Sequence, residues 1–110
     1  MAQPTTYSAF WLHYLRVHAR PATRRVHCVG TGAALGLALA GLLRRDWRLA
    51  LAAPVVGYGA AWSAHVGLEG NTPATFGHPA WSLFSDLRMA GLMLTGRLRP
   101  HLQEAGVVAD

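Results

Sequence analysis

Residues 28–43 read CVGTGAALGLALAGLL and contain no charged side chain. The basic stretch RRDWR follows at residues 44–48, and residues 49–69 then form a second apolar run, LALAAPVVGYGAAWSAHVGLE. As helices, the two runs would be about 24 Å and about 30 Å long. The first reaches the length of a membrane span only when the flanking turns are included. Two apolar helices joined by a short basic turn predict an antiparallel helical hairpin.

Proline- and glycine-containing segments divide the rest of the chain. A helix is expected over residues 5–19, because Pro21 forces a boundary just after it. Residues 70–78 are rich in Gly, Asn, Thr and Pro and predict a loop, after which a fourth helix is expected over residues 79–98. The segment after Pro100 is expected to be loosely held.

The fold class predicted from these segments is all-α. Alternation of apolar and polar residues, which is typical of half-buried strands, never persists for five positions. We predict a membrane-embedded four-helix bundle with the antiparallel hairpin at its centre. Residues 1–110 are expected to form a single domain, with a core over residues 5–98 and a loosely ordered tail over residues 100–110.

The composition favours a membrane protein. Apolar residues make up 52% of the 110 residues and charged residues 14%, against roughly 25% charged in typical soluble domains. A chain of this length cannot hide so much apolar surface in one core, and this balance also excludes a disordered chain. All ten basic residues are arginine and the net charge is +5. Because the arginines flank the apolar runs, we expect a multi-pass integral protein in contact with membrane lipid, and no nucleic-acid partner.

Several common sites and segments are excluded. Cys28 is the only cysteine, so the chain has no internal disulfide and no CxxC metal site. The N-terminal residues lack the basic and apolar regions of a cleaved signal peptide, and none is expected. No nucleophile elbow, Walker loop, dinucleotide fingerprint or HExxH pattern is present, which excludes ordinary hydrolase, NTPase and dehydrogenase sites.

Small residues follow one side of the first apolar run. Gly32 and Gly36 form a GxxxG pattern that several alanines continue. Such faces allow close packing of helices in lipid, although the pattern is common by chance in chains rich in Ala and Gly.

Three histidines are predicted to lie at one level of the bundle. His27 and His65 are equally far in sequence from Asp46 at the centre of the turn, so on antiparallel helices they lie at the same depth. His18 ends the first helical segment, which must arrive at that same end of the hairpin. The three imidazoles are therefore expected to converge from three helices.

The faces of the helices agree with this convergence. At helical spacing, each of three segments presents one stripe, and two of these stripes are aromatic and end in a potential ligand. The stripes are Tyr7, Trp11, Tyr14 and His18; Tyr58, Trp62, His65 and Glu69; and Ser82, Asp86, Met89 and Met93. The aromatic members are also explained as ordinary packing faces.

His65 and Glu69 point to a metal. An imidazole and a carboxylate four residues apart on an apolar helix are costly unless they are paired or metal-bound. A His/Glu cluster without thiolates suits iron, zinc, nickel or copper, and two His plus a carboxylate favour non-haem Fe(II). Asp86 could hold the second nitrogen of a ligand histidine, or it could pair with Arg88 or another arginine. The remaining histidines, at positions 13, 78 and 101, are not predicted to be ligands.

Two separated stretches of the chain resemble the signatures of one family. The first comprises FWLHYLRVH at residues 10–18, Pro21 and RVHCVGT at residues 25–31; the second is GAAWSAHVGLEGNTPATF at residues 59–76. PAWSL at residues 79–83, Asp86 and Met89 continue the match. Over residues 7–93 the chain resembles the small membrane 2-hydroxy fatty acid dioxygenases, which include the fungal enzyme of phytosphingosine breakdown.

The resemblance implies an Fe(II)-dependent enzyme of fatty acid α-oxidation. It would convert a 2-hydroxy fatty acid and O2 into a fatty acid one carbon shorter, with loss of the carboxyl carbon. The family's histidines correspond to His18, His27 and His65, which would bind Fe(II) and carry catalysis with Glu69, as fourth ligand or base. The chain departs from the family where asparagines usually follow the first histidine, because Arg20 and Thr23 or Arg24 occupy those positions. It also lacks the long middle segment of fungal members.

The substrate is expected to chelate iron through its carboxylate and hydroxyl groups. Its acyl tail would lie in an apolar groove among the last three helices, and Arg24, Arg25 or Arg88 would attract its carboxylate. Two alternatives remain open: a non-enzymatic membrane protein whose histidines hydrogen-bond across helices, and a membrane metalloenzyme of different lipid chemistry. No oligomeric state is predicted.

Overall fold

The computed structural model describes residues 4–71 and 77–107. These residues form five α-helices and one π-helical turn, with no β-strand among them. The elements, in chain order, are α1 (Tyr7–Val17), α2 (Pro21–Arg44), α3 (Trp47–Ala64), η1 (His65–Glu69), α4 (Pro79–Leu94) and α5 (Arg99–Ala105). The predicted all-α class is confirmed for this part of the chain.

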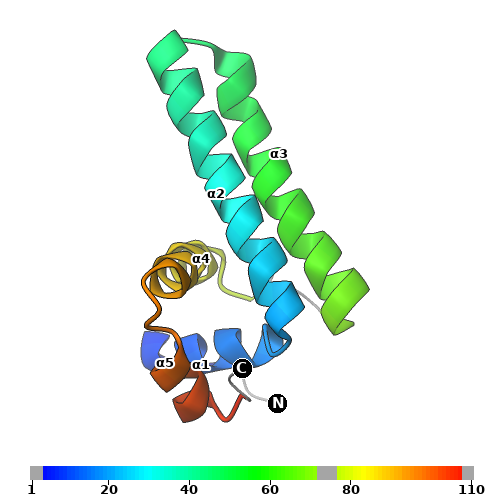
Figure 1. The fold of residues 1–110 in the computed structure, drawn as a ribbon, viewed down its shortest axis with the longest axis vertical. Helices are drawn as coiled ribbons and strands as arrows, with labels where there is room; N and C mark the ends of the chain where they lie inside the picture. Colours follow the sequence, from blue (N-terminus) through cyan, green and yellow to red (C-terminus); the bar gives the residue numbers. More distant parts are fainter. Residues whose placement is uncertain (1–3, 72–76, 108–110) are drawn as a thin grey trace.

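The antiparallel hairpin predicted from the apolar runs is formed by α2 and α3 (Figure 1). At the turn, Arg45 adopts a left-handed conformation with φ 52°, and the backbone N–H of Asp46 donates to the Gly41 carbonyl at 2.9 Å. The Asp46 side chain then caps α3 by accepting from the Arg48 N–H at 3.0 Å, as short acidic side chains do at helix N-termini. The charged turn therefore ends one helix and begins the next.

Small residues let the two helices of the hairpin approach closely. A Cβ atom added at Gly30 would lie 2.5 Å from the Ala60 Cβ, and one added at Gly57 would lie 3.2 Å from the Ala34 Cβ. Nothing lies within 4 Å of a Cβ added at the two glycines of the GxxxG pattern, Gly32 and Gly36. The hairpin contact is therefore made by a different face of α2 from the one that carries the pattern.

The four-helix bundle prediction is wrong. Helices α1, α4 and α5 pack together at the open end of the hairpin and do not run alongside it; α1 lies across its base and α4 is seen nearly end-on (Figure 1). The reason is the aromatic face of α1, which packs into a separate core against α4 and α5. That core consists of Phe10, Trp11, Tyr14, Leu15, Met89, Leu98, Leu102 and Ala105.

The helix α5 begins just before Pro100 and covers residues 100–105 of the tail that was expected to be loosely held; residues 108–110 of that tail lie outside the described residues. Leu102 and Ala105 are buried in the core. The Trp11 Nε1–H donates to His101 Nδ1 at 3.1 Å, and Arg16 Nε donates to the Ala105 carbonyl at 2.9 Å. Long-range contacts with α1 thus hold α5 in place, although this short helix has little apolar periodicity of its own.

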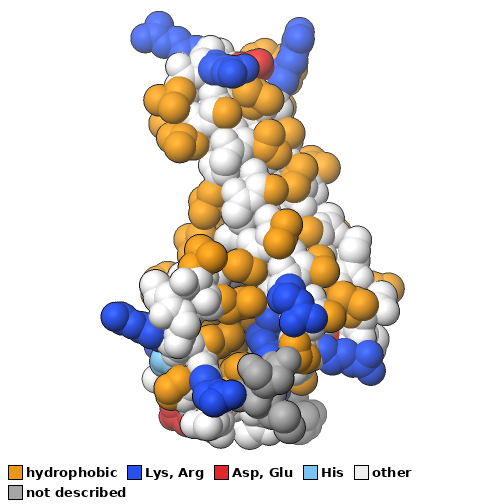
Figure 2. Space-filling model, viewed as in Figure 1, with side chains coloured by type: hydrophobic (Ala, Val, Ile, Leu, Met, Phe, Trp, Pro, Cys, Tyr) orange, Lys and Arg blue, Asp and Glu red, His pale blue; other side chains and the backbone are white. Residues whose placement is uncertain are grey.

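The hairpin exposes most of its apolar side chains. Figure 2 shows hydrophobic side chains along its length, with arginines gathered at its tip and around its base. Residues Pro21–Arg44 and Trp47–Glu69 are each long and apolar enough to cross a membrane, and only 17% and 22% of their most apolar windows are buried. A core helix of a soluble protein would be mostly buried, and exposed apolar faces of this extent are typical of surfaces that contact a membrane or another protein.

Candidate metal centre

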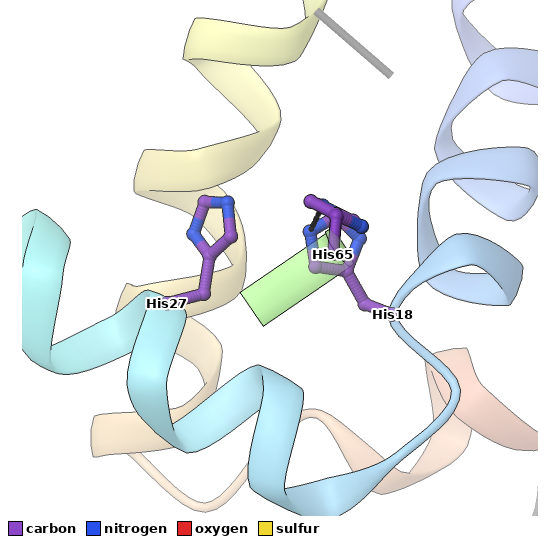
Figure 3. Close-up of side chains that lie close together, drawn as sticks. All are labelled: His18, His27 and His65. Atoms are coloured by element: carbon purple, nitrogen blue, oxygen red, sulfur yellow. Dashed lines mark hydrogen bonds between the residues drawn. The ribbon is translucent and has the colours of Figure 1, made fainter. Parts of the chain in front are cut away.

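Three buried histidines meet where the hairpin joins the other helices (Figure 3). His18 ends α1, His27 lies in the first half of α2, and His65 follows α3. Their exposed fractions are 1%, 5% and 1%, and one potential ligand nitrogen from each lies within 4.8 Å of the others. The convergence predicted from their distances to Asp46 is confirmed, and this group could hold a metal ion.

His18 is held by its own helix and by a buried arginine. Its Nδ1–H donates to the Tyr14 carbonyl at 2.6 Å, and its ring stacks on the Tyr14 ring with the centroids 4.1 Å apart. Arg24 Nη1 donates to the carbonyls of His18 and Ala19 at 2.9 and 2.8 Å. Because the carbonyl of Tyr14 can only accept, the lone pair of His18 is on Nε2.

His65 is held by a π-helical turn and by Asn71. The backbone N–H groups of Gly70 and Asn71 both donate to the His65 carbonyl, and Gly70 allows this closure because its φ is +70°. The Asn71 Nδ2–H donates to the Val17 carbonyl at 3.0 Å, which turns Asn71 Oδ1 toward His65 Nδ1 at 2.7 Å. His65 must therefore donate from Nδ1, and its lone pair is also on Nε2.

His27 faces a carboxylate. Its Nε2 lies 3.4 Å from Asp86 Oδ1, which also accepts the Tyr14 hydroxyl at 2.5 Å. This contact agrees with the predicted alternative in which Asp86 holds a histidine. Among the described residues, His27 Nδ1 has no hydrogen-bond partner although it is buried. A buried nitrogen without a partner costs free energy, so a ligand bound at this nitrogen would be stabilising.

The arrangement of His18 and His65 fits a bound cation. Their Nε2 atoms lie 3.0 Å apart, and the hydrogen bonds described above give both atoms a lone pair. Two lone pairs at that distance repel one another unless a proton or a metal ion lies between them. Burial and the imidazoles of His27 and His65 lower the pKa of His18 well below its ordinary value, so His18 stays in the neutral form that can bind a metal ion.

The carboxylate beside the histidines is unusual. Burial raises the pKa of Asp86 to about 6, against the opposing effect of the hydrogen bond from Tyr14. Burial, and to a smaller extent the nearby charge of Asp86, raises the pKa of Tyr14 well above its ordinary value. Tyr14 therefore remains a hydrogen-bond donor to Asp86 throughout the physiological range.

Glu69 is not part of the histidine group. Its carboxylate Oε1 accepts the Arg20 backbone N–H at 2.5 Å, which ties η1 to the start of α2. The ligand position predicted for Glu69 assumed regular α-helical spacing from His65, and the wider π-helical turn changes the direction of the side chain. The structure brings His18, His27 and His65 together without Glu69.

An apolar groove of about 270 Å³ begins at the centre. Its described lining comes from α2, α3 and α4 and contains His27 and Asp86 at one end, with no arginine. Two of the arginines expected to attract a carboxylate have other contacts. Arg24 holds the α1–α2 turn, and the guanidinium carbon of Arg88 lies 4.3 Å from the centre of the Trp11 ring.

The comparison with protein families adds to this geometry. A family model described as 2-hydroxy-palmitic acid dioxygenase Mpo1-like matches residues 4–98. The chain belongs to the Mpo1-like family. No curated protein and no solved structure matches the chain.

The Mpo1-like match covers the whole candidate centre. It includes all three histidines, Asn71 and Asp86, and it ends just before α5. The predicted resemblance to 2-hydroxy fatty acid dioxygenases is confirmed at the level of the family, and the family's name implies a 2-hydroxy fatty acid as substrate.

Sequence reasoning missed the contact between Asn71 and His65 in this Mpo1-like chain. The available signal was a single side-chain amide next to the glycine that ends the segment carrying His65. Its importance depends on two contacts, with Val17 and with His65, that join segments far apart in the sequence. Arg24 was considered for its charge and as a departure from the family pattern, and its hydrogen bond to the His18 carbonyl depends on the geometry of the turn.

Proposed function

We propose that the protein is an Fe(II)-dependent dioxygenase of 2-hydroxy fatty acids. The substrate and O2 would give a fatty acid one carbon shorter, carbon dioxide and water. Four electrons pass from the substrate to O2 as the bond between its first two carbons breaks, so no 2-oxoglutarate is required. The observation that carries the proposal is the buried group of three imidazoles in an Mpo1-like chain, with two of the Nε2 atoms 3.0 Å apart.

His18, His27 and His65 are the proposed iron ligands. Bound Fe(II) would supply the redox chemistry that activates O2. The contribution of the chain is to keep the imidazoles neutral and oriented: the Tyr14 carbonyl and Asn71 Oδ1 accept the Nδ1–H protons of His18 and His65. Such outer contacts determine the tautomer and direction of ligand histidines. Glu69 has a positioning role in this proposal, through its contact with the Arg20 backbone.

Asp86 and the groove would bind the substrate. Asp86 lines the polar end of the groove beside His27, where its carboxylate can accept the hydrogen bond of the substrate's 2-hydroxyl group. With a fatty acid that lacks the 2-hydroxyl group, the Asp86 carboxylate would not receive this hydrogen bond. The site would therefore favour the 2-hydroxy acid. The apolar remainder of the groove would hold the acyl chain and exclude water from the reacting end.

The hairpin is proposed to cross the membrane. Its two apolar helices are mostly exposed and carry arginines only near the ends, as expected for lipid-facing spans. Carbonate extraction of membranes from expressing cells tests this proposal. The protein should remain in the membrane pellet, whereas release into the supernatant would contradict a spanning hairpin.

Oxygen uptake is the direct test of the reaction. Purified protein loaded anaerobically with Fe(II) should consume O2 with 2-hydroxypalmitate but not with palmitate, and should release pentadecanoate. His65→Ala should abolish both bound iron and uptake, while His13→Ala, which alters a histidine outside the centre, should retain both.

The other outcomes separate the alternatives. Bound iron without uptake on 2-hydroxypalmitate would overturn the proposed reaction and retain the metal centre. Activity with zinc and without O2 would indicate a different lipid chemistry. Full iron content and turnover in His65→Ala would overturn the ligand assignment, and the absence of any stoichiometric metal would favour a non-enzymatic membrane protein.

A further inference from the structure

The groove beside the metal centre is polar at one end and apolar elsewhere. His27 and Asp86 lie at the polar end, and Thr31 follows one turn along α2. The rest of the described lining is apolar: Ala34, Leu35, Ala38, Ala53, Pro54, Gly57, Tyr58, Leu83 and Leu87, of which only Tyr58 carries a polar group. This pattern matches a molecule with one polar end and an apolar remainder, because further polar groups along the groove would lose their hydrogen bonds.

The groove is as long as a lipid tail. Along α2, the lining extends from His27 to Ala38, which corresponds to about 16 Å at the rise of an α-helix. One leaflet of a bilayer contributes about half of a hydrocarbon core of roughly 30 Å. A fatty acid whose carboxyl end lies at the histidines would therefore extend along the hairpin for most of the length of its acyl chain.

Small side chains at the far end leave the groove free. Ala38 on α2 and Ala53 on α3 form that end, and Ala38 is exposed whereas Ala53 is buried. A larger side chain at Ala38 would occupy the groove without entering the contact between α2 and α3. Thr31 lies two turns nearer to His27, which is about 10 Å along the helix.

We propose that this groove is the acyl-chain site and that positions along α2, from Thr31 to Ala38, determine how long a chain can lie with its carboxyl end at the histidines. The proposal rests on the proposed function for the nature of the polar end. The groove itself is defined by the hairpin and α4, so it can be tested with ligands that do not react.

The test is the displacement of a fluorescent fatty acid from detergent-purified protein by plain saturated fatty acids, from octanoate to stearate. Ala38→Phe should weaken the binding of palmitate and stearate by about tenfold and leave octanoate within about twofold of wild type. Thr31→Phe should weaken even the shorter acids, because it obstructs the groove nearer to the histidines. Ala33→Phe is the matched control, since Ala33 is exposed on the same helix and outside the lining, and it should bind the whole series like wild type.

Two results would overturn the proposal: an equal loss for all chain lengths in a folded Ala38→Phe protein, or unchanged binding of stearate. Ala38→Leu provides a smaller obstruction if the Phe variant lacks wild-type helicity, and it should give the same dependence on length at reduced size. Because plain fatty acids lack the 2-hydroxyl group and need no turnover, a length-dependent loss supports the groove even if oxygen uptake fails. Oxygen uptake without any length dependence would support the reaction and overturn the groove.

Discussion

The Nε2 atoms of His18 and His65 lie 3.0 Å apart, although the two residues follow different helices and each ring is held by a separate acceptor at Nδ1. Each ring therefore directs a lone pair at the other. A proton or a cation between the two atoms would remove the repulsion of these lone pairs. The cost of binding a cation is low, because the two nitrogen atoms are already in place before the ion arrives.

The first prediction concerns metal binding and stability. Fe(II), or Zn(II) as a redox-inert substitute, should raise the free energy of unfolding by about 2.7 kcal/mol at a hundredfold excess over its Kd, because it binds only the folded centre. Thermal unfolding with and without metal measures the effect. His65→Ala should lose the metal-dependent increase, and an equal increase in that variant would place the ion elsewhere.

Asn71 is predicted to position His65. Asn71→Ala removes both the acceptor for His65 Nδ1 and the donor to the Val17 carbonyl, so metal affinity should fall by about 10-fold to 100-fold. Titration with a competing chelator measures the affinity. Gln103→Ala removes an exposed amide and is the control; wild-type affinity in Asn71→Ala would show that His65 does not need this contact.

Arg24 is predicted to position His18 through the backbone. Arg24→Ala leaves the carbonyls of His18 and Ala19 without their donor, which should reduce the free energy of unfolding by about 1–3 kcal/mol and weaken metal binding. Arg24→Lys should recover only part of the loss, because an ammonium group lacks the planar fork. Arg25→Ala changes an exposed neighbour and should remain within about 0.5 kcal/mol of wild type. Equal effects at both positions would indicate a general effect of charge.

Two glycines on α2 should respond in opposite directions to the same substitution. Gly30→Ala places a Cβ 2.5 Å from the Ala60 Cβ, and overpacking of this kind costs about 1–3 kcal/mol. Gly32→Ala meets nothing within 4 Å and should stabilise the helix by about 0.5–1 kcal/mol. Unfolding in detergent compares the two variants. Destabilisation by Gly32→Ala would indicate that the GxxxG face of α2 packs against another helix.

The last prediction tests whether α5 belongs to the folded core. Leu102 is 4% exposed and Leu94 is 82% exposed. Leu102→Ala should therefore cost about 2–5 kcal/mol through the cavity that it leaves, whereas Leu94→Ala should cost less than about 0.5 kcal/mol. Denaturant unfolding measures both. If α5 were loosely held, the two substitutions would both change the free energy of unfolding only slightly, and this result would contradict the prediction.

Local sequence determined the hairpin and the meeting of the histidines. Two uncharged helical runs on either side of the capping residue Asp46 specify the antiparallel pair, and helical rise then places His27 and His65 at one level. Both inferences depend only on regular geometry within a helix, which neighbouring residues largely decide.

Tertiary structure decided the rest of the centre and the shape around it. The π-helical turn after α3 moves Glu69 to the Arg20 backbone and brings in Asn71, because hydrogen bonds to another segment override regular spacing. The aromatic face of α1 packs with α4 and α5 rather than along the hairpin, since burial of large rings outweighs the simplest bundle topology. Sequence spacing could therefore bring the three histidines together, but only contacts between distant segments could determine which groups hold them in place.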